Sequence, residues 1–307
     1  MNVIGIDTSN YTTSIAYYDG TSGENCSRLL PVKAGELGLR QSDAVFAHVK
    51  SLPELSDRLF SHVGEKKIHA VGVSTRPRAV EGSYMPCFMV GYSHAKLMAD
   101  LLCVPLVEVS HQQGHVAASL WSSNHMELMD EPHIAWHLSG GTTELLLVEP
   151  EGKNVKCTKI GGTTDISAGQ LIDRTGQLLQ LPFPSGKHLD AISKQASDKE
   201  TFKVKCANMS FSLSGVQNKV QQYHVVHNSP EETAAYALRC VANAVYTATQ
   251  QALKAYPGLR VVFSGGVASN SLLRSAMVSL NPIFSEPQYS TDNAMGVAVL
   301  AHRITEG

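Results

Sequence analysis

Several features of membrane, secreted and zinc-ribbon proteins are missing from this sequence. It contains no apolar run of roughly 18 residues, the length from which a membrane-spanning helix is expected. It begins without the basic and apolar regions of a signal peptide. Its six cysteines include no C-x-x-C pair, which favours reduced thiols over a disulfide framework or a zinc ribbon. These absences predict a cytoplasmic protein without membrane contact.

A surplus of positive charge is also absent. The chain has 25 Lys and Arg residues against 27 Asp and Glu residues, a formal net charge of -2. Proteins that bind nucleic acid over a broad face are usually basic, so any such contact must use a local patch or a partner's patch. Apolar residues make up 43% of the 307 residues. That content excludes a disordered chain, and the length suits two domains or one large α/β unit.

A weak internal repeat is present. A shift of 130 residues places Thr12 and Thr13 on Thr142 and Thr143, and it aligns the apolar triplets 4–6 and 15–17 with 134–136 and 145–147. Each pair of triplets predicts a strand hairpin, so the repeat indicates a duplicated fold. Turn-forming residues gather at 122–132. We therefore expect two subdomains, 1–125 and 126–307.

The remaining periodicity predicts alternating helices and strands. Before the boundary, helices are predicted at 43–62, with a kink or new segment at Pro53, at 83–102, and at 110–120 after the N-cap Ser110. Strands are predicted at 69–74 and 105–109. After the second hairpin, helices are predicted at 167–179, 186–196 and 230–255, then after Asn270 and from about Asp292. A strand is predicted at 260–263, with loops and short strands over 199–214.

Three loops that follow predicted strands are rich in Gly, Ser and Thr, namely 7–14, 139–143 and 265–270. Small residues let backbone N–H groups approach phosphate oxygens, and hydroxyl groups add donors. Two loops related by a repeat, with Gly265 and Gly266 opening a helix in the third, favour nucleotide binding. The alternative is ordinary turn chemistry. Asp7 is a candidate for holding Mg²⁺ or orienting a phosphate, or else it only initiates its own turn.

His111 and His115 form an H-x-x-x-H pair, and on a helix this spacing puts both imidazoles on one face. The spacing proves little in a chain with 13 histidines, and it names no third ligand. Structural histidines are the alternative. Asp173 and Asp190 are candidates for binding ligand hydroxyl groups, and the alternative is that they are solvated helix-capping residues. The basic loop tip formed by Arg76, Pro77 and Arg78 is a candidate phosphate or partner contact, and the alternative is a solvated loop.

Taken together, these motifs resemble the TsaD/Gcp family of tRNA N6-adenosine threonylcarbamoyltransferases, formerly described as O-sialoglycoprotein endopeptidases. The resemblance covers nearly the whole chain, in order and approximate spacing. It is carried by Gly5-Ile6-Asp7-Thr8-Ser9, His111-x-x-Gly114-His115, Ser139-Gly140-Gly141-Thr142, Ala168-Gly169-x-x-x-Asp173, Leu181-Pro182-Phe183-Pro184-x-Gly186-x-x-x-Asp190, Phe211-Ser212-x-Ser214-Gly215, Gly265-Gly266-Val267-Ala268-x-Asn270 and Thr291-Asp292-Asn293-Ala294.

The resemblance implies an α/β fold of the actin, sugar kinase and Hsp70-like (ASKHA) type, with two duplicated subdomains around a nucleotide cleft. It implies one Fe or Zn ion on His111, His115 and Asp292, and an ATP- or AMP-type nucleotide accompanied by Mg²⁺. Asp7 and Ser9 are the expected catalytic residues. The expected nucleotide and substrate residues are Ser139, Gly140, Gly141, Thr142, Asp173, Gly186, Asp190, Gly265, Gly266 and Asn270.

In this family the carbamoyl carbonyl of threonylcarbamoyl-AMP is attacked by N6 of adenosine 37 of tRNA, and AMP is released. The resemblance implies that tRNA binds with the help of partner subunits, TsaB-like or others. Near-zero net charge is compatible with that arrangement.

The chain departs from the family pattern at several polar positions. The first loop reads Asp7-Thr8-Ser9-Asn10-Tyr11-Thr12 in place of Glu-Thr-Ser-Cys-Asp-Glu, and Thr142 replaces a His. Gln113 and Gln170 replace Glu, which removes two proton acceptors. Residues 76–83 replace a Gly-Pro-Gly loop. These departures leave two alternatives open: a divergent paralogue that transfers a carbamoyl-type group to another acceptor, or a non-catalytic nucleotide-binding partner subunit.

Overall fold

The computed structural model describes residues 1–9, 11–31 and 39–306, which fall into two compact units. Unit 1 comprises Met1–Glu131, Glu149–Cys157 and Asp292–Gly307, and unit 2 comprises Pro132–Val148 and Thr158–Thr291. Asn10, which belongs to the first predicted loop, lies outside the described residues. The subdomain boundary at residue 125 stays a prediction.

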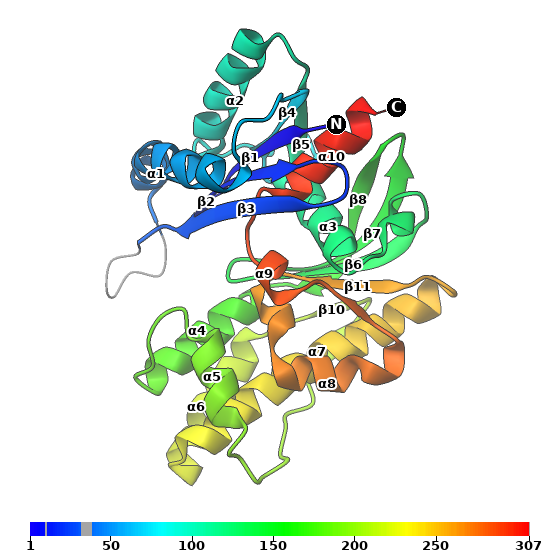
Figure 1. Ribbon diagram of the computed structural model, residues 1–307. Helices are drawn as coiled ribbons and strands as arrows, with labels where there is room; N and C mark the ends of the chain where they lie inside the picture. Colours follow the sequence, from blue (N-terminus) through cyan, green and yellow to red (C-terminus); the bar gives the residue numbers. More distant parts are fainter. Residues whose placement is uncertain (10, 32–38, 307) are drawn as a thin grey trace. The chain divides into compact units, whose positions relative to one another are not determined.

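Unit 1 is built on a five-stranded sheet in the order β3-β2-β1-β4-β5 (Figure 1). The pairs β1–β2 and β2–β3 are antiparallel, whereas β4 lies parallel to both β1 and β5. The carboxyl ends of β1, β4 and β5 therefore meet at one edge of the sheet. The strands are β1 (Val3–Ser9), β2 (Thr12–Tyr18), β3 (Gly23–Leu29), β4 (Ala70–Arg76) and β5 (Leu106–Ser110).

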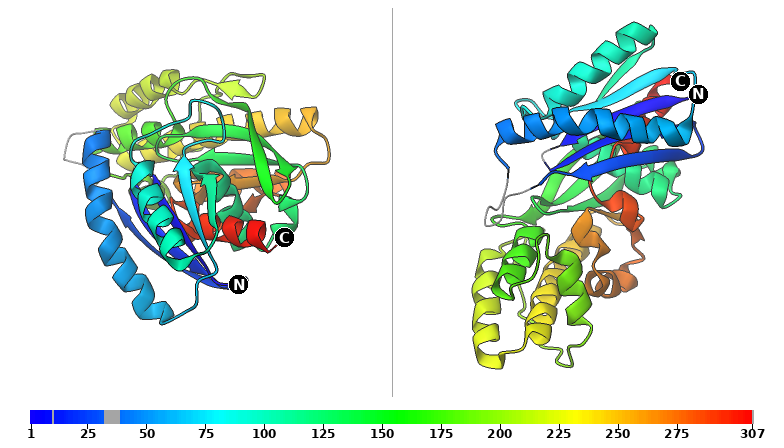
Figure 2. Two further views of the ribbon diagram at one scale, coloured as in Figure 1. Left: turned by 90° about the horizontal axis from the view of Figure 1, so that it is seen from above. Right: turned by 60° about the vertical axis from the view of Figure 1, so that its left-hand side comes forward.

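Helices cover both faces of this sheet (Figure 2). A Cβ atom on Gly5 would lie 2.6 Å from the carbonyl oxygen of Ala294, so one face of β1 packs directly on α10. A Cβ atom on Gly91 of α2 would lie 2.8 Å from Thr8 Oγ1, on the opposite face of the same strand. The helices are α1 (Gln41–Val63) and α2 (Phe88–Leu102) on one face, and α3 (His111–Ser122) and α10 (Met295–Thr305) on the other.

Unit 2 contains most of a seven-stranded sheet in the order β12-β11-β6-β7-β8-β10-β9, and the long helix α7 contacts the other helices α4, α5, α6 and α8. The buried Trp136 of β6 donates its indole N–H to Thr249 Oγ1 of α7 at 2.8 Å, which ties sheet to helix. The strands are β6 (His133–Leu138), β7 (Thr143–Glu151), β8 (Asn154–Thr163), β9 (Cys206–Ala207), β10 (Ser210–Phe211), β11 (Val261–Ser264) and β12 (Ile283–Phe284). The helices are α4 (Ala168–Leu178), α5 (Gly186–Ser193), α6 (Ser214–His227), α7 (Pro230–Ala255), α8 (Ser271–Met277) and α9 (Pro287–Ser290), and 3-10 turns span Met126–Met129, Gly266–Ser269 and Val278–Leu280.

The predicted duplication is confirmed residue by residue. Val3 pairs with Tyr18 and Thr8 with Thr13 in the first hairpin; His133 pairs with Val148 and Leu138 with Thr143 in the second. Every one of these positions differs by 130, the shift found in the sequence. The strand order β3-β2-β1-β4-β5 recurs as β8-β7-β6-β11-β12. Each unit thus contains the same five-stranded core.

Several predicted boundaries were wrong, among them the helix predicted from about Asp292, which begins at Met295. Asp7, Thr8 and Ser9 belong to β1 and not to a turn, because Thr8 and Ser9 continue the ladder with Thr13 and Thr12. Pro53 does not interrupt α1, since it lies exposed while flanking apolar residues of the helix pack on the sheet.

The helix predicted from residue 83 begins only at Phe88, because a tight turn around Gly82 precedes it. Five of the described strands and helices were not predicted: β3 and β8, whose outer faces are polar, the polar helix α6, and the short elements β12 and α9. In the described part of the chain, no helix has both the length and the apolar character needed to span a membrane.

Candidate metal centre and nucleotide loops

The local sequence at the start of α3 sets the two histidines on one face. Ser110 is the N-cap: its hydroxyl accepts from Gln113 N, and Gln113 Oε1 accepts from Ser110 N at 2.9 Å. This reciprocal capping box fixes the first turn of the helix directly after β5. His111 therefore lies at the carboxyl edge of the unit 1 sheet, and His115 lies one turn further along the same face.

The third member of the group comes from 177 residues further along the chain. Helices α3 and α10 cross so closely that a Cβ atom on Gly296 would lie 1.8 Å from the carbonyl oxygen of Gly114. Because the two helices approach so closely at these glycines, the segment before α10, which includes Asp292, lies beside the histidine pair. Asp292 Oδ1 lies 3.2 Å from His115 Nε2 and 3.5 Å from His111 Nε2.

The spacing of these three atoms suits a metal ion. The two Nε2 atoms of His111 and His115 are 3.0 Å apart, so the three donor atoms form a triangle with edges of 3.0–3.5 Å. Zinc bonds to imidazole and carboxylate of about 2.0–2.1 Å at tetrahedral angles put neighbouring ligand atoms about 3.3 Å apart. The three side chains are buried or partly buried. They can therefore hold one metal ion with little rearrangement.

Asp7 lies behind His111 in this arrangement. The Asp7 side chain is fully buried, and its Oδ1 lies 3.0 Å from His111 Nδ1 and accepts a short hydrogen bond from the Ser74 hydroxyl. A carboxylate on Nδ1 selects the tautomer that leaves the Nε2 lone pair for a metal. Asp7 Oδ2 and Ser9 Oγ are buried without a hydrogen-bond partner among the described residues.

The charges of the group reinforce one another. Burial by itself would lower the pKa of His111, but the Asp7 charge and the hydrogen bonds that the ring donates to Asp292 and Asp7 raise it to about 10. Burial would raise the pKa values of Asp7 and Asp292, yet contacts with the histidines hold both below the ordinary value. Two carboxylates thus face an imidazolium in the protein without metal, and a divalent ion must displace that proton.

Gln113, one of the two residues that replace an acid, does not point at the metal centre. Its side-chain oxygen completes the α3 capping box, and its Nε2 donates to the carbonyl oxygen of Val155 at 2.7 Å. Gln170 has the same place in α4: its Oε1 accepts from Ser167 N, and Ser167 Oγ accepts from Gln170 N. Both glutamines are therefore helix-capping residues in this chain.

In unit 2, Ser139, Gly140, Gly141 and Thr142 form the tight connection between β6 and β7. Ser139 N donates to Thr142 O at 2.8 Å, and Thr142 N donates to Ser139 Oγ at 3.1 Å. Cβ atoms on Gly140 and Gly141 would meet no heavy atom within 4 Å, so the backbone of this loop is open to a ligand. The N-terminus of α4 packs against it, since Ser167 Oγ donates to Gly140 O.

The third predicted loop is built around Gly265, whose φ is 91° and whose Cβ atom would lie 2.2 Å from Leu138 O. Only glycine fits there. Asn270 caps α8 by accepting from Leu273 N, and its Nδ2 donates to Asp190 Oδ1 at 2.8 Å.

Asp190 and Asn270, predicted separately, are thus in direct contact. Asp190 Oδ1 also accepts from the N–H and hydroxyl of Ser271. The pKa of Asp173 is raised by burial, and its carboxylate accepts from Ser185 N, directly before Gly186 at the start of α5.

Sequence reasoning missed two residues that hold these sites in place. Ser74 could have been found, because it lies near the carboxyl end of β4, a strand parallel to β1, and so shares that edge of the sheet with Asp7. Asp165 accepts from Leu213 N at 2.8 Å and from the hydroxyls of Ser212 and Ser214, and it thereby holds the Phe211–Gly215 motif. No pattern in the sequence pointed to that contact.

Comparison with known proteins identifies the family. The TsaD family model, described as tRNA N6-adenosine threonylcarbamoyltransferase, matches residues 37–299. A Carboxydothermus hydrogenoformans protein of that name is 30% identical over 272 residues, which are 85% of this chain and 78% of that protein. A Thermosipho africanus protein of the same name is 28% identical and covers 99% of this chain and 94% of its own length.

Solved structures confirm the predicted fold class. HypF from T. kodakarensis superimposes with a TM-score of 0.67 at 14% identity, over 100% of this chain and 48% of that one. A ROK hexokinase from Thermus thermophilus gives a TM-score of 0.55 at 15% identity, over the full length of both chains. These likenesses show the ASKHA fold. The family match and the two relatives go further, and the chain belongs to the TsaD family of transferases.

Proposed function

We propose that this chain transfers the threonylcarbamoyl group of threonylcarbamoyl-AMP to N6 of adenosine 37 of tRNA, and that His111, His115 and Asp292 hold an Fe or Zn ion for this reaction. The observation that carries the proposal is the donor triangle with edges of 3.0–3.5 Å, backed by a buried carboxylate on the far nitrogen of His111. Structural histidines alone do not call for three converging donors or for that second carboxylate.

The residues around the centre have separable tasks. When bound, the ion would act as a Lewis acid toward carbonyl and phosphate oxygens and stabilise developing negative charge. Asp7 fixes the His111 ring and, with Asp292, supplies two negative charges that balance a divalent cation. The balanced group can therefore accept a further anionic ligand such as a phosphate.

The transfer reaction needs little acid–base catalysis from the protein. The adenosine N6–carbon bond forms, the carbon–oxygen bond to the phosphate of AMP breaks, and N6 loses a proton. AMP leaves as a stable phosphate anion, so no strong general acid is required. The replacement of Glu by Gln at positions 113 and 170 is compatible with this reaction, because both side chains serve helix caps.

We propose that the unit 2 loops bind the adenylate. The open backbone of Gly140 and Gly141 offers N–H groups for a phosphate. Asp173, Asp190 and Asn270 are the proposed contacts for ligand hydroxyl groups. Asp190 Oδ1 accepts from Asn270 and Ser271, and Oδ2 lies 3.7 Å from Lys194 Nζ, so a ligand hydroxyl group at Oδ2 would share that oxygen with the lysine.

A reconstituted reaction tests the proposal. The purified chain, loaded with Fe²⁺ or Zn²⁺, is incubated with threonylcarbamoyl-AMP, tRNA and the partner proteins of its own host, and the nucleosides are analysed by mass spectrometry. Threonylcarbamoyladenosine is expected. Its absence, with consumption of the adenylate by a different amine, would favour another acceptor. Tight adenylate binding without any turnover would favour a non-catalytic subunit.

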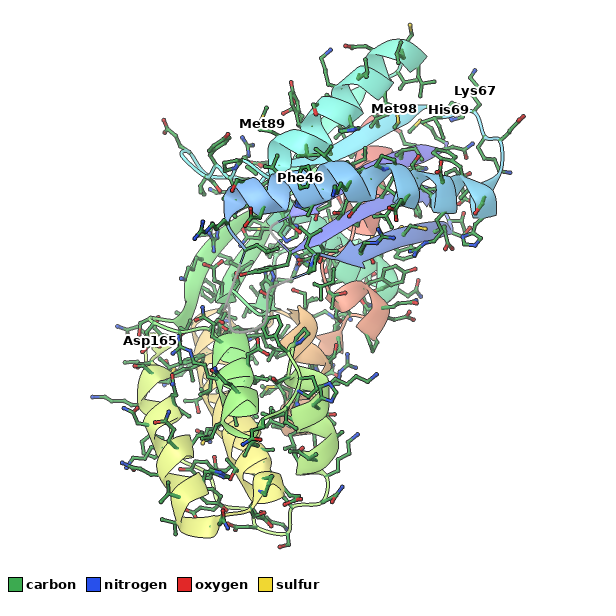
Figure 3. The ribbon with its side chains drawn as sticks, turned by 90° about the vertical axis from the view of Figure 1, so that its left-hand side faces the viewer. Phe46, Lys67, His69, Met89, Met98 and Asp165 are labelled. Carbon is green, nitrogen blue, oxygen red and sulfur yellow. The ribbon has the colours of Figure 1, made fainter. Side chains whose placement is uncertain are left out.

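We further propose that a TsaB-like or other partner subunit docks on the outer side of α1 and α2. Phe46 of α1 and Met89, Leu97 and Leu101 of α2 are 47–76% exposed. Figure 3 shows Phe46 and Met89 on the outer side of their helices. Because the chain has no basic surplus, the partner would supply part of the tRNA contact. The change Leu101→Glu should abolish co-purification with the partner, whereas Val278→Glu, in unit 2, should not.

A further inference from the structure

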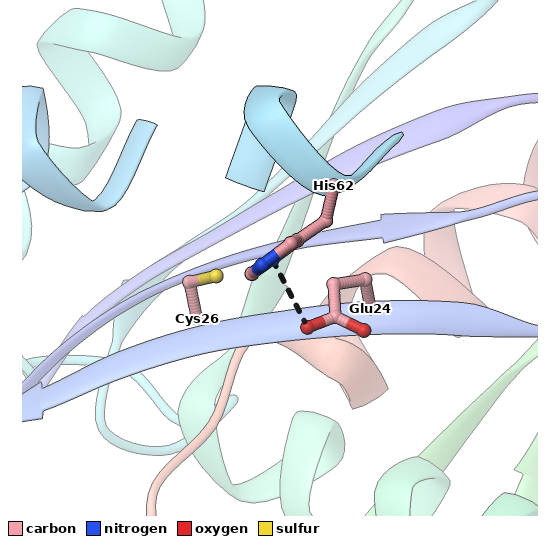
Figure 4. Close-up of side chains that lie close together, drawn as sticks. All are labelled: Glu24, Cys26 and His62. Atoms are coloured by element: carbon pink, nitrogen blue, oxygen red, sulfur yellow. Dashed lines mark ion pairs between the residues drawn. The ribbon is translucent and has the colours of Figure 1, made fainter. Parts of the chain in front are cut away.

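A second group of metal-binding side chains lies in unit 1, on elements that the transfer reaction does not use. Glu24 and Cys26 lie two residues apart on β3, and His62 lies in the last turn of α1 (Figure 4). One donor atom from each side chain lies within 4.8 Å of the other two. His62 Nδ1 and Glu24 Oε1 are 3.8 Å apart.

The way α1 lies along β3 places His62 beside Glu24 and Cys26. Arg28 of β3 pairs with Glu54 of α1 at 2.6 Å, and Arg58 donates to the Ser27 carbonyl oxygen at 3.5 Å. These contacts recur along the helix toward its C-terminal end. His62 is four residues beyond Arg58, one helical turn, which carries it to the level of Cys26 and Glu24.

The three side chains differ in how freely they can move. Cys26 is 1% exposed and packs in the core with Leu55 and Leu59, so its sulfur is fixed. The side chains of His62 and Glu24 are 59% and 48% exposed. A fixed thiol with an imidazole and a carboxylate free to rotate toward it from the solvent side can close on an ion from water.

We propose that Glu24, Cys26 and His62 bind one Zn²⁺ ion. Thiolate, imidazole and carboxylate are the donors that zinc prefers, and three protein ligands leave a fourth position for water. Tetrahedral zinc needs its ligand atoms about 3.3–3.8 Å apart. The His62 and Glu24 donor atoms, 3.8 Å apart, are already at such a separation, and because all three donor atoms lie within 4.8 Å of one another, each distance to the Cys26 sulfur needs to shorten by about 1 Å at most.

Binding would form a zinc–sulfur bond and release the thiol proton to the solvent, so that the thiolate and carboxylate charges balance the dication. The ion would join the C-terminal end of α1 to β3, which gives it a structural role in unit 1. The site is distinct from the one in the proposed function, since the two share no residue.

Cobalt(II) is a suitable probe because only a cysteine ligand produces a thiolate-to-cobalt charge-transfer band in the near ultraviolet. The full chain, reduced and freed of metal, is titrated with Co²⁺. We expect this band to saturate by two equivalents in the wild type, because the group of His111, His115 and Asp292 also takes up Co²⁺ without producing the band, and at one equivalent in His115→Ala. Cys26→Ser should abolish it, and His62→Ala and Glu24→Gln should each weaken the binding measured by the band at least tenfold.

Two matched variants separate this site from other sources of signal. Cys103→Ser removes an exposed cysteine outside the group, and His115→Ala disables the other metal group; both should keep the band at full strength. Circular dichroism checks that Cys26→Ser folds, and the exposed His62 and Glu24 give variants that leave the core intact. The proposal is overturned if excess Co²⁺ gives no band, if Cys26→Ser keeps it, or if His62→Ala binds as tightly as the wild type.

Discussion

Restoring the family's usual acid at position 113 should cost stability without a gain in activity. Gln113 is 4% exposed, and its Nε2–H group is the donor to the Val155 carbonyl oxygen at 2.7 Å. In Gln113→Glu, that donor becomes a carboxylate oxygen that faces a carbonyl oxygen. The other side-chain oxygen can still accept from Ser110, so the capping box itself survives.

The magnitude follows from these two contacts. Leaving a buried acceptor unpaired costs about 1–3 kcal/mol, and more where a charge is involved. A negative charge in the first turn of α3 returns about 0.3–1 kcal/mol through the helix dipole. The net loss should be about 1–3 kcal/mol, and each kcal/mol corresponds to roughly 2–4 °C in the melting temperature of a domain of 150–250 residues.

Thermal unfolding at neutral pH, followed by circular dichroism, measures this loss. Gln170→Glu is the matched control: Gln170 occupies the same capping position in α4 but is exposed, and its side chain donates to no buried carbonyl oxygen among the described residues. It should change stability by less than about 0.5 kcal/mol. A Gln113→Glu protein as stable as the wild type, or one that transfers tenfold faster, would refute this account of residue 113.

Three further outcomes are expected. Gly265→Ala should destabilise unit 2 by at least about 2 kcal/mol, because of its φ of 91° and a clash at 2.2 Å, whereas Gly266→Ala, with its nearest neighbour at 3.7 Å, should be nearly neutral in a denaturant titration. Burial raises the pKa of Asp165, but the hydrogen bonds from Ser212 and Ser214 outweigh burial and hold that pKa below its ordinary value. The contribution of the Asp165 carboxylate to folding stability is therefore complete above about pH 4 and is lost as pH falls further. Asp165→Asn should therefore melt below the wild type at pH 7, with a gap that shrinks at pH 3; a constant gap would contradict this. Asp292→Asn should weaken metal retention at least a hundredfold in a chelator competition, and equal retention would exclude Asp292 as a ligand.

The duplication was the feature that the sequence predicted best. Strand pairing in each hairpin repeats at the shift of 130 because the apolar segments of both hairpins have the same lengths and the same spacing, and both hairpins are buried. The end of β1 was mispredicted for a local reason. Asp7, Thr8 and Ser9 are residues typical of turns, and only their pairing with β2 and the Thr8 hydrogen bond to Cys87 O keep them extended.

The candidate site was predicted only in part from the residues themselves. Helical spacing brings His111 and His115 together, but nothing local connects them to Asp292, which arrives through the close crossing of Gly114 and Gly296. That ligand came from the family resemblance. The capping role of Gln113 was also invisible in the sequence, since the same Ser-x-x-Gln pattern is compatible with a side chain that points into a site.

The metal dependence of the transfer tests the central claim most directly. Wild-type and His115→Ala proteins are stripped of metal, reloaded with one Fe²⁺ or Zn²⁺ series, and assayed for threonylcarbamoyladenosine in tRNA with the partner proteins present. The wild type should regain activity in proportion to the metal bound at His111, His115 and Asp292, and His115→Ala should stay inactive although it folds. Full activity in the stripped wild type, or equal activity in His115→Ala, would contradict the account.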